Sequence, residues 1–564
     1  ADILGSMYEK YIGRIQSHRK EQGIYYTPGY IVDYIVRNTL GEVLKGLKKP
    51  EDADKIKVLD MACGSGSFLL KAFEVFDEYY AKKQGRVAQA KLGSSDEDIN
   101  IKKKAQILQN SIFGVDLDAK AVEIAQLNLL LKTAETRHRL PLLKDNIQHG
   151  NSLIDDEKVA PGTAFKWEER FAGIMNEGGF DVIIGNPPYV RPHKIDERTK
   201  RYLWKHSKVV KAKGDLYAAF IERGIDLLKE KGEISLIVPH TWLSLESFED
   251  LRSYINQKCK ITSITIAPKK VFQDATVETL IFVFERCSSE EARKRNSVEL
   301  LSIDENSKIS KLGIKKQAVL DKEGIFDLST GPSEKLVKKI DTSSTKLKDR
   351  VDFFYGLKTA DDDKFLTFAP KNGTEYKKLL RRSDFGRYYV KFKDEYVFYK
   401  PELMRKNKNT ARPGEPQRFE EPKIVIMDIA KKLVCTFDDQ GYYIKDALLL
   451  KNKDSHILKY LVALINSKVL NYYYLQKYKV LSVAKNAFLE LPIKSDNTQD
   501  KVVALVDKLL SLNKQLQSFG DKQTSERQRL EDEIKRADAE IDRLVYDIYG
   551  LTEGERNIVE ASMK

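Results

Sequence analysis

The most restrictive feature of the sequence is a regular alternation of short apolar segments and helical segments between residues 56 and 284. Such alternation is typical of a mostly parallel sheet with helices on both faces, because a helix fills each parallel crossover. The last two strands are joined by only about a dozen residues, so we expect an antiparallel hairpin at one sheet edge. The predicted strands are Ile56–Leu59, Ile112–Val115, Val182–Ile184, Ile234–Val238, Ile261–Ile266 and Thr279–Phe284, and the predicted helices are Phe68–Tyr79, Lys120–Lys132 and Tyr217–Lys229.

Changes in composition suggest boundaries along the rest of the chain. We expect a helical segment over residues 1–50, the alternating domain over 51–290, a linker region over 291–345, a second α/β domain with short strands over 346–495 and a helical hairpin over 496–564. The hairpin is expected because apolar residues recur at helical spacing in two stretches. The alternative is a platform for another domain. The apolar residues are Val502, Leu505, Val506, Leu509 and Leu516, then Leu530, Ile534, Ala537, Ile541, Leu544 and Ile548, with a turn at 518–521.

The charge balance narrows the class of partner. Lys and Arg number 97 against 84 Asp and Glu, giving a formal net charge of +13. Such a surplus suits nucleic acid or an anionic membrane. The sequence has no apolar run long enough for a transmembrane helix and no visible secretory signal.

The four cysteines lie far apart without zinc-ligand spacing, which indicates buried thiols in a cytoplasmic protein. The chain begins at Ala1, so we also expect processing, a tag, or a cut from a longer polypeptide.

A glycine-rich turn follows the first predicted strand. The segment from Asp60 to Phe68 contains Gly64 and Gly66, which allow a tight bend and close approach of a ligand to main-chain N–H groups. The third glycine of a dinucleotide fingerprint is absent. Asp116, at the end of the next strand, can accept both hydroxyls of a ribose. The pattern therefore indicates a nucleoside site without a pyrophosphate cradle; the alternative for Asp116 and Asp118 is capping of the following helix.

The strongest signal is the segment Asn186-Pro187-Pro188-Tyr189, a rigid polar loop after a buried strand. A ring-conjugated amino group is a poor nucleophile. The Asn186 side chain and the Pro187 carbonyl can accept its two hydrogens, orient the nitrogen lone pair and stabilise the developing positive charge. The prolines preorganise the carbonyl, and Tyr189 offers a face for stacking. A base attacked in this way must leave the duplex.

Four motifs in fixed order carry a resemblance to a known family. LDMACGSGSF, FGVDLD, HGNSL and IIGNPPY resemble the gamma class of S-adenosylmethionine-dependent DNA adenine methyltransferases. The chain looks most like the methylase and specificity part of Type IIG/IIL restriction-modification polypeptides with a TaqI-like C-terminal domain. This resemblance implies an α/β class I methyltransferase fold, Rossmann-like with a mostly parallel seven-stranded sheet. An α/β target-recognition domain and C-terminal helices would follow.

The resemblance also implies roles for individual residues. The YYTP segment would close over the methionine end of S-adenosylmethionine, the glycine loop would hold its methionine side, and Asp116 its ribose. Asn151 stands where an Asp is frequent, and Phe220 would line the cofactor's adenine pocket. The implied cofactor-binding residues are Thr27, Pro28, Asp60, Ala62, Gly64, Gly66, Asp116, Leu117, Asn151 and Phe220.

The implied catalytic residues are Asn186, Pro187, Pro188, Tyr189 and Phe272, the last as a second aromatic ring against the flipped base. For Phe220 and Phe272 an ordinary core role is the alternative. His240 resembles a general base, but we prefer a structural role because transfer from a sulfonium needs none. No metal is expected for methyl transfer.

The C-terminal half is expected to recognise DNA. The loop from Lys400 to Arg412 holds five basic residues and one acid, which suits contact with phosphates; the alternative is a solvated basic loop. The cluster of tyrosines at 472–478 is more typical of a core than of a stacking platform. The candidate DNA contacts are Lys358, Arg381, Arg382, Lys400, Arg405, Lys406, Lys408 and Arg412.

The sequence thus predicts a cytoplasmic enzyme that methylates the exocyclic amine of a flipped adenine in duplex DNA, within a restriction-modification system. The alternatives are methylation of RNA or of a protein glutamine amide, or a non-catalytic DNA-recognition module. No convincing nuclease constellation is present, so an N-terminal nuclease domain or a separate restriction subunit is a candidate partner. No membrane partner is expected.

Overall fold

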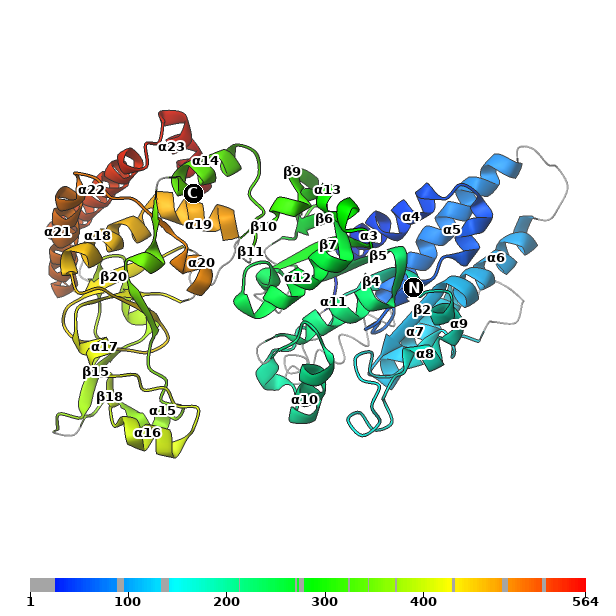
Figure 1. Cartoon of the computed structure of the whole chain (residues 1–564), viewed down its shortest axis with the longest axis horizontal. Coiled ribbons are helices and arrows are strands. Elements are labelled where there is room, and N and C mark those ends of the chain that lie inside the picture. The colour runs from blue at the N-terminus through cyan, green and yellow to red at the C-terminus, as the bar shows by residue number, and fades with distance from the viewer. Residues whose placement is uncertain are drawn as a thin grey trace. The chain divides into compact units, whose positions relative to one another are not determined.

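The computed structural model describes residues 26–88, 96–132, 142–211, 214–268, 271–272, 278–322, 325–342, 344–370, 373–428, 432–478, 485–519 and 524–563. The chain divides into two compact units, the first ending at Asp327 and the second beginning at Leu328. Figure 1 labels their helices and strands.

One sheet organises the first unit. Among the described residues its nine strands have the order β3-β2-β1-β4-β5-β7-β6-β8-β9. The pairings from β3 to β5 are all parallel, and β7 runs antiparallel to both β5 and β6. The strands are β1 (Val58–Asp60), β2 (Ile112–Asp116), β3 (Ile147–His149), β4 (Phe180–Gly185), β5 (Leu228–Pro239), β6 (Cys259–Ile266), β7 (Thr279–Arg286), β8 (Ser297–Ile303) and β9 (Ile309–Lys316).

The predicted α/β fold with a mostly parallel sheet is confirmed, with three differences in detail. The strand β3 was not predicted as a strand, because it is three residues long with a polar residue, Gln148, at its centre. The hairpin of β6 and β7 is antiparallel as expected but does not form the sheet edge. The reason is that β8 pairs in parallel with β6 and β9 pairs with β8. The sheet therefore has nine strands, not seven, and two of them come from the segment 291–345 that was expected to be a linker.

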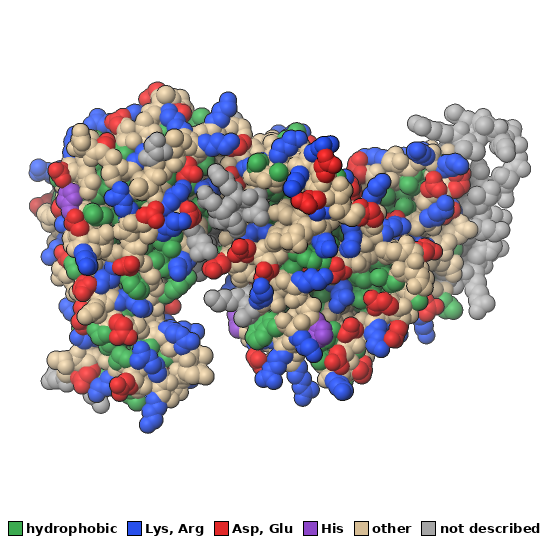
Figure 2. Space-filling view, viewed as in Figure 1, with side chains coloured by type: hydrophobic (Ala, Val, Ile, Leu, Met, Phe, Trp, Pro, Cys, Tyr) green, Lys and Arg blue, Asp and Glu red, His purple; other side chains and the backbone are tan. Residues whose placement is uncertain are grey.

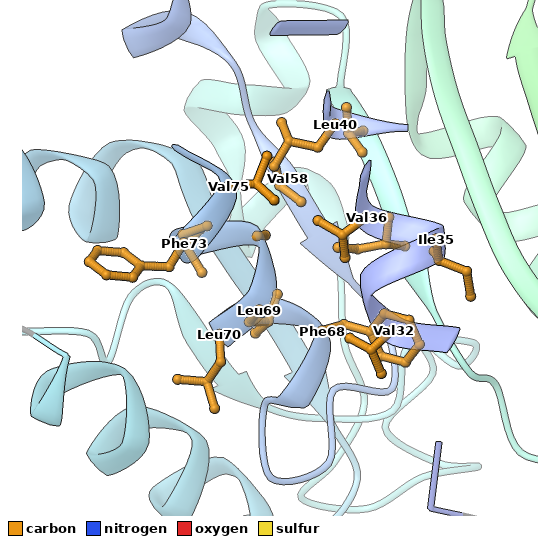
Figure 3. Close-up of a cluster of buried hydrophobic side chains, with 14 of the residues drawn as sticks. Val32, Ile35, Val36, Leu40, Val58, Phe68, Leu69, Leu70, Phe73 and Val75 are labelled. Carbon is orange, nitrogen blue, oxygen red and sulfur yellow. The ribbon is translucent and has the colours of Figure 1, made fainter. Parts of the chain in front are cut away.

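Helices cover the sheet and create the core of the first unit. Apolar residues of α3 (Gly29–Asn38) and α4 (Leu40–Gly46) pack against the start of α5 (Ser67–Ala88) and against β1. Figure 3 shows Val36 on the side of α3 that faces Val58 and Leu69, whereas Ile35 points to the other side of that helix. Within the described residues of this unit, the other helices of eight or more residues are α6 (Asp96–Ser111), α7 (Ala119–Leu131), α10 (Glu197–His206), α11 (Leu216–Leu227) and α12 (Glu249–Lys258). The helices α3 and α4 are thus packed against the start of α5, next to the glycine-rich turn.

Two small sheets form the centre of the second unit. Among its described residues, one sheet contains β13 (Asp352–Tyr355), β22 (Leu448–Lys451), β19 (Lys423–Ile426) and β20 (Cys435–Asp438), in that order. The other contains β14 (Leu366–Thr367), β18 (Tyr396–Phe398), β15 (Tyr376–Leu380) and β21 (Tyr443–Ile444). In addition, β12 (Thr345–Lys346) pairs with β23 (Pro492–Ile493), so the chain enters and leaves this region at one place.

Helices complete the second unit. They include α14 (Gly331–Asp341), α18 (Ser455–Asn466), α19 (Lys468–Tyr478), α21 (Gln499–Ser518), α22 (Ser525–Ile548) and α23 (Glu553–Met563). The expected terminal helices are present, with α21 and α22 in contact and α23 additional to them. Part of the expected turn at 518–521 lies outside the described residues. The tyrosines of α19 are buried, as the core interpretation predicts. No helix in the described part of the chain is long and apolar enough to cross a membrane.

Candidate active site

The candidate site lies where β1 and β4, neighbours in the centre of the sheet, reach their carboxyl ends. The chain order reverses at this point, since β2 and β3 lie on one side and β5 on the other. Open α/β sheets bind ligands at such a switch point. Asp60 ends β1, Asp116 ends β2 and Gly185 ends β4. A Cβ at Gly185 would lie 2.6 Å from Asp60 Oδ1, so glycine is required for the two strand ends to approach.

The glycine-rich turn is held by hydrogen bonds from the neighbouring strand. The N–H of Gly64 donates to Asp116 Oδ2 at 2.8 Å, and the N–H of Cys63 donates to the Val115 carbonyl at 3.1 Å. The N–H of Gly66 closes the turn onto the Cys63 carbonyl at 2.8 Å. Asp116 Oδ1 accepts from the N–H of Asp118 at 2.8 Å, while the Asp118 side chain caps α7. Asp118 therefore caps the following helix, which was the alternative role considered for both acids. Asp116 does not cap it but orders the glycine-rich turn.

The two glycines of this turn predict different effects of an added methyl group. Gly66 has φ +91°, and a Cβ there would lie 3.1 Å from Ala125 Cβ; Gly64 has φ +53° with nothing within 4 Å. We expect Gly66→Ala to lower the free energy of unfolding by about 1–3 kcal/mol through backbone strain and crowding. Gly64→Ala is the matched control, with a loss of about 1 kcal/mol from the left-handed backbone alone. Urea unfolding measures both; equal losses would contradict the packing argument.

Asp60 is a buried carboxyl group beneath the turn. Its side chain is 1% exposed, and its Oδ1 accepts from the N–H of Ala62 at 3.0 Å. Among the described residues no group donates to its Oδ2. Burial raises the pKa of Asp60 to about 8; the Ala62 N–H opposes this shift and the charge of Asp116 adds to it. A buried carboxyl with one unused oxygen is suited to a ligand ammonium.

The raised pKa of Asp60 makes stability depend on pH. An unfolded Asp ionises near pH ~4, whereas the folded carboxyl has a pKa of about 8, so between these values the folded state holds the extra proton. The free energy of unfolding should therefore fall as pH rises across this window, by up to about 1.4 kcal/mol per pH unit. Asp60→Asn keeps an acceptor for Ala62 but cannot ionise, so its unfolding free energy should fall less steeply with pH. Urea titrations of both proteins across the window test this, and parallel slopes would refute it.

The structure brings two predicted motifs into direct contact. Asn186, immediately after β4, donates from Nδ2 to the Thr27 hydroxyl at 3.1 Å. Thr27 is 6% exposed and precedes Pro28, whose carbonyl accepts the first N–H bonds of α3. This contact spans 159 positions of sequence. Because the amide nitrogen of Asn186 donates within the protein, the orientation of the amide group, and so the direction of its oxygen, is fixed.

An aromatic cluster surrounds Tyr189. Its hydroxyl donates to the Ile237 carbonyl at 2.9 Å, which holds the ring against the end of β5. Phe272 lies edge-on to it, with ring centroids 6.0 Å apart and an interplanar angle of 72°. Tyr217, on α11, packs against the same ring at 6.3 Å and 79°. The two rings predicted to contact the base, Tyr189 and Phe272, thus lie side by side, while Tyr217 was not predicted as a neighbour.

The remaining predicted cofactor residues lie near the ends of β2 and β3 and on α11. The N–H of Gly150 donates to the Asp116 carbonyl at 2.9 Å, which places the next residue, Asn151, beside that strand end. Leu117 is 58% exposed, unusual for a leucine that follows a buried strand. Phe220 is 7% exposed on α11, so a core role remains as compatible with its position as a pocket role.

One residue near the site was missed by the sequence analysis. Asp215 precedes α11 but makes no capping hydrogen bond, and burial raises its pKa to about 6, opposed by Arg191. It adjoins the Asn186 loop, because the N–H of Leu216 donates to the Val190 carbonyl at 3.0 Å. From sequence, an acid directly before a helix is normally interpreted as its cap. Only the structure shows that Asp215 makes no capping bond. His240, by contrast, contacts the Glu278 carbonyl through Nδ1 at 2.9 Å, as a structural residue would.

In the second unit, three of the predicted DNA contacts gather at one place. Lys358 and Arg412 form an antiparallel bridge, with both N–H···O bonds at 2.8 Å, and both side chains are exposed. Arg405 and Arg412 line one hollow together with Arg418, which was not predicted. The guanidinium of Arg418 lies 4.5 Å from the ring centroid of Phe354.

The other predicted contacts differ in how far their charges are already paired. Arg381 makes two bonds to the buried Glu395, at 2.7 and 2.6 Å, and Arg382 donates to Asp428 at 2.6 Å. Looser pairs join Lys400 to Glu375 at 3.4 Å, Arg405 to Glu415 at 3.7 Å and Lys408 to Asp361 at 3.7 Å, while Lys406 is exposed. Paired guanidiniums contribute less to phosphate binding, so Arg381 and Arg382 are better suited to holding the local fold.

No cluster of three or more His, Cys, Asp or Glu side chains able to hold a metal occurs in the part of the chain that the structure describes. The four cysteines are buried thiols.

Comparison with known proteins agrees with this geometry. Residues 110–272 match the family described as Eco57I restriction-modification methylase, and residues 377–493 match the TaqI-like C-terminal specificity domain. The Type II restriction enzyme and methyltransferase RM.Eco57I of Escherichia coli is 31% identical over 315 residues, which cover 50% of this chain and 31% of that protein. The Type II methyltransferase M.BstVI of Geobacillus stearothermophilus is 25% identical, over 44% of this chain and 39% of its own.

Solved structures share the fold of the chain. The Type IIL restriction-modification enzyme MmeI in complex with DNA gives a TM-score of 0.58 at 13% identity, covering 93% of this chain and 74% of that one. A nuclease-deletion mutant of the Type ISP enzyme LlaGI gives 0.59 at 14% identity, covering 87% and 47%. The matches to the first curated relatives span less than half the length of each. The chain therefore combines an Eco57I-like restriction-modification methylase domain with a TaqI-like C-terminal specificity domain.

Proposed function

We propose that this chain is a cytoplasmic, site-specific DNA methyltransferase. It transfers the methyl group of S-adenosylmethionine to the exocyclic amino group of an adenine flipped out of duplex DNA, within a restriction-modification system. The observation that carries the proposal is the hydrogen bond of 3.1 Å from Asn186 Nδ2 to the Thr27 hydroxyl. It joins the loop expected to hold the target amine to the segment expected to close over the cofactor.

The chain's own residues fit the cofactor at the ends of β1 and β2. The unused Oδ2 of buried Asp60 can accept from an ammonium group, and the open space at Gly64 leaves room beside the turn. Asp116 uses one lone pair on each oxygen for Gly64 and Asp118, so each oxygen can still accept from one ribose hydroxyl. The bound cofactor supplies an electrophilic sulfonium methyl group. Leu117, which is exposed, would cover its adenine.

The target amine would be held by two acceptors. Nδ2 of Asn186 donates to Thr27, so we assign Oδ1 of the same amide as the acceptor of one amine hydrogen and the Pro187 carbonyl as the acceptor of the second. Withdrawal of both hydrogens keeps the nitrogen lone pair out of conjugation and stabilises positive charge in the transition state. Because Tyr189 and Phe272 are inclined at 72°, a planar base can stack on only one ring and must meet the edge of the other.

The second unit is the proposed source of sequence recognition. Exposed Lys358 is brought together with Arg405 and Arg412 of the predicted basic loop. Their arrangement supports contact with double-stranded DNA. A nuclease domain or a separate restriction subunit remains the proposed partner for cleavage.

The test is transfer of labelled methyl from S-adenosylmethionine to unmethylated genomic DNA, followed by single-molecule sequencing of the product. Methyladenine at one recurring word is the expected result. Label in RNA or in a protein glutamine, with none in DNA, would replace the proposed substrate. Absence of transfer to any acceptor, with DNA binding retained, would leave a non-catalytic recognition module.

A further inference from the structure

The segment after the Asn186 loop carries an unpaired row of positive charge on α10. Arg198, Arg201 and Lys205 recur at steps of three and four, which places them on one helix face, and all three are exposed. Within the described residues, no carboxylate forms an ion pair with any of them. On α13 (Glu290–Arg295), by contrast, Lys294 and Arg295 each pair with an acid one turn away. The three cations on α10 are therefore not neutralised by an acid within the described residues.

The helix is held rigidly at both ends, so the charged face has a defined position. Asp196 caps its first turn by accepting from the N–H groups of Arg198 and Thr199, both at 3.0 Å. The buried Tyr202 donates to Asp155 at 2.5 Å. Just after the helix, the N–H of Lys208 donates to the buried Glu222 on α11 at 2.7 Å.

A hollow with a charged lining lies beside the same helix. The hydroxyl of Tyr202 donates to Asp155, which lines this hollow with Asp156, Glu157, Glu169, Lys166 and Arg170. The lining is of mixed charge, whereas the row of Arg198, Arg201 and Lys205 carries positive charge alone and would attract a polyanion. Figure 2 shows Lys and Arg side chains along the margin of this unit over α10. The loop that precedes the helix continues directly from Tyr189, so the charged face belongs to the same unit as the proposed site of methyl transfer.

We propose that the Arg198–Arg201–Lys205 face of α10 binds the phosphates of duplex DNA next to the flipped adenine. Seven residues of helix span about 10 Å, and successive phosphates of one strand advance about 3.4 Å along the duplex axis, so the row is as long as about three phosphate steps. This contact is independent of base sequence; it places the duplex against the site, while the second unit reads the word. The inference rests on the proposed function.

The test compares two variants of equal charge in the full chain. Arg198→Gln/Arg201→Gln/Lys205→Gln removes the face, and Lys48→Gln/Lys49→Gln/Lys82→Gln removes three other exposed lysines of the same unit. The affinity for a short labelled duplex is measured over a range of salt. For the α10 variant we expect the slope of log affinity against log salt to fall by about three, and the affinity at 0.1 M salt by about 100-fold. The α10 variant should lose the same affinity for duplexes with and without the methylated word. The control variant should keep the wild-type salt slope.

Trp204 provides a second measurement on the wild-type chain. It is 44% exposed beside the row, whereas Trp167 and Trp242 are 2% and 0% exposed, and the chain has three tryptophans. Duplex DNA should therefore protect tryptophan fluorescence from a soluble quencher. Suppose that wild type methylates DNA. If the α10 variant then keeps the wild-type salt slope, or if DNA does not change the quenching of wild-type tryptophan fluorescence, the α10 contact is refuted and the proposed function stands. If wild type neither binds nor methylates DNA, the proposed function itself fails.

Discussion

Replacement of Asn186 by alanine should lower kcat for methyl transfer to DNA by about 10²–10³-fold, the usual effect of removing one preorganised group that stabilises transition-state charge. The side chain lies after β4 with its Nδ2 bonded to Thr27 at 3.1 Å, so its oxygen is held in place before the base arrives. The variant loses that acceptor but leaves the glycine turn and Asp116 untouched. Cofactor affinity should therefore stay at the wild-type value. Single-turnover transfer of labelled methyl, with calorimetric cofactor binding, measures the two quantities.

Two further variants make this result specific. Asn176→Ala changes an exposed asparagine at the end of α9 (Ala172–Asn176) and should leave kcat unaltered. Thr27→Val removes the hydroxyl that orients Asn186 and should cost about tenfold in kcat, the value of one hydrogen bond. Near-normal methylation by Asn186→Ala would show that the loop does not hold the amine. An Asn186→Ala loss matched by an equal loss in Asn176→Ala would indicate general damage instead.

Replacement of Asp116 by alanine should raise the cofactor Kd by about 100-fold, because hydrogen bonds to a charged group contribute about 1.5–3 kcal/mol each. The carboxylate also orders the turn by accepting from Gly64 and Asp118, both at 2.8 Å, so the variant loses acceptors and preorganisation together. Isothermal calorimetry with S-adenosylmethionine gives the affinity. DNA binding measured without cofactor should not change.

The neighbouring acid supplies the matched control. Asp118→Ser keeps an oxygen to cap α7 through the N–H of Lys120, which Asp118 now accepts at 2.9 Å, and should bind cofactor nearly as wild type does. Wild-type cofactor affinity in Asp116→Ala would remove Asp116 from the proposed ribose site. An equal loss in both variants would show that the helix cap, rather than the carboxylate of Asp116, governs binding.

Local sequence was sufficient for much of the fold. The buried strands at β1, β2, β4, β5, β6 and β7 were predictable because each is a short apolar run between turn signals, and the helices α5, α7 and α11 were predictable from apolar spacing. The helices α6, α10 and α12 were not among the predicted helices. Strand β3 was not, because a short strand with Gln148 at its centre has no such run. Strand β8 has buried apolar residues but directly follows a charged segment, so it was assigned to a linker. The four exposed positions at the start of β9 give no burial pattern to recognise.

By itself the sequence determined the chemistry that the chain can present: a glycine turn after one strand, an acid after the next, and Asn-Pro-Pro-Tyr after a third. These depend on residue type and on the strand that precedes each. Only the tertiary structure decided which side chains meet. Four features depend on partners far apart in sequence or on neighbouring elements. They are the contact of Thr27 with Asn186, the lack of a capping bond at Asp215, the ion pairs of Arg381 and Arg382, and the row of cations on α10. The physical reason is that side-chain pairing is set by strand order and helix packing, which local patterns constrain only indirectly.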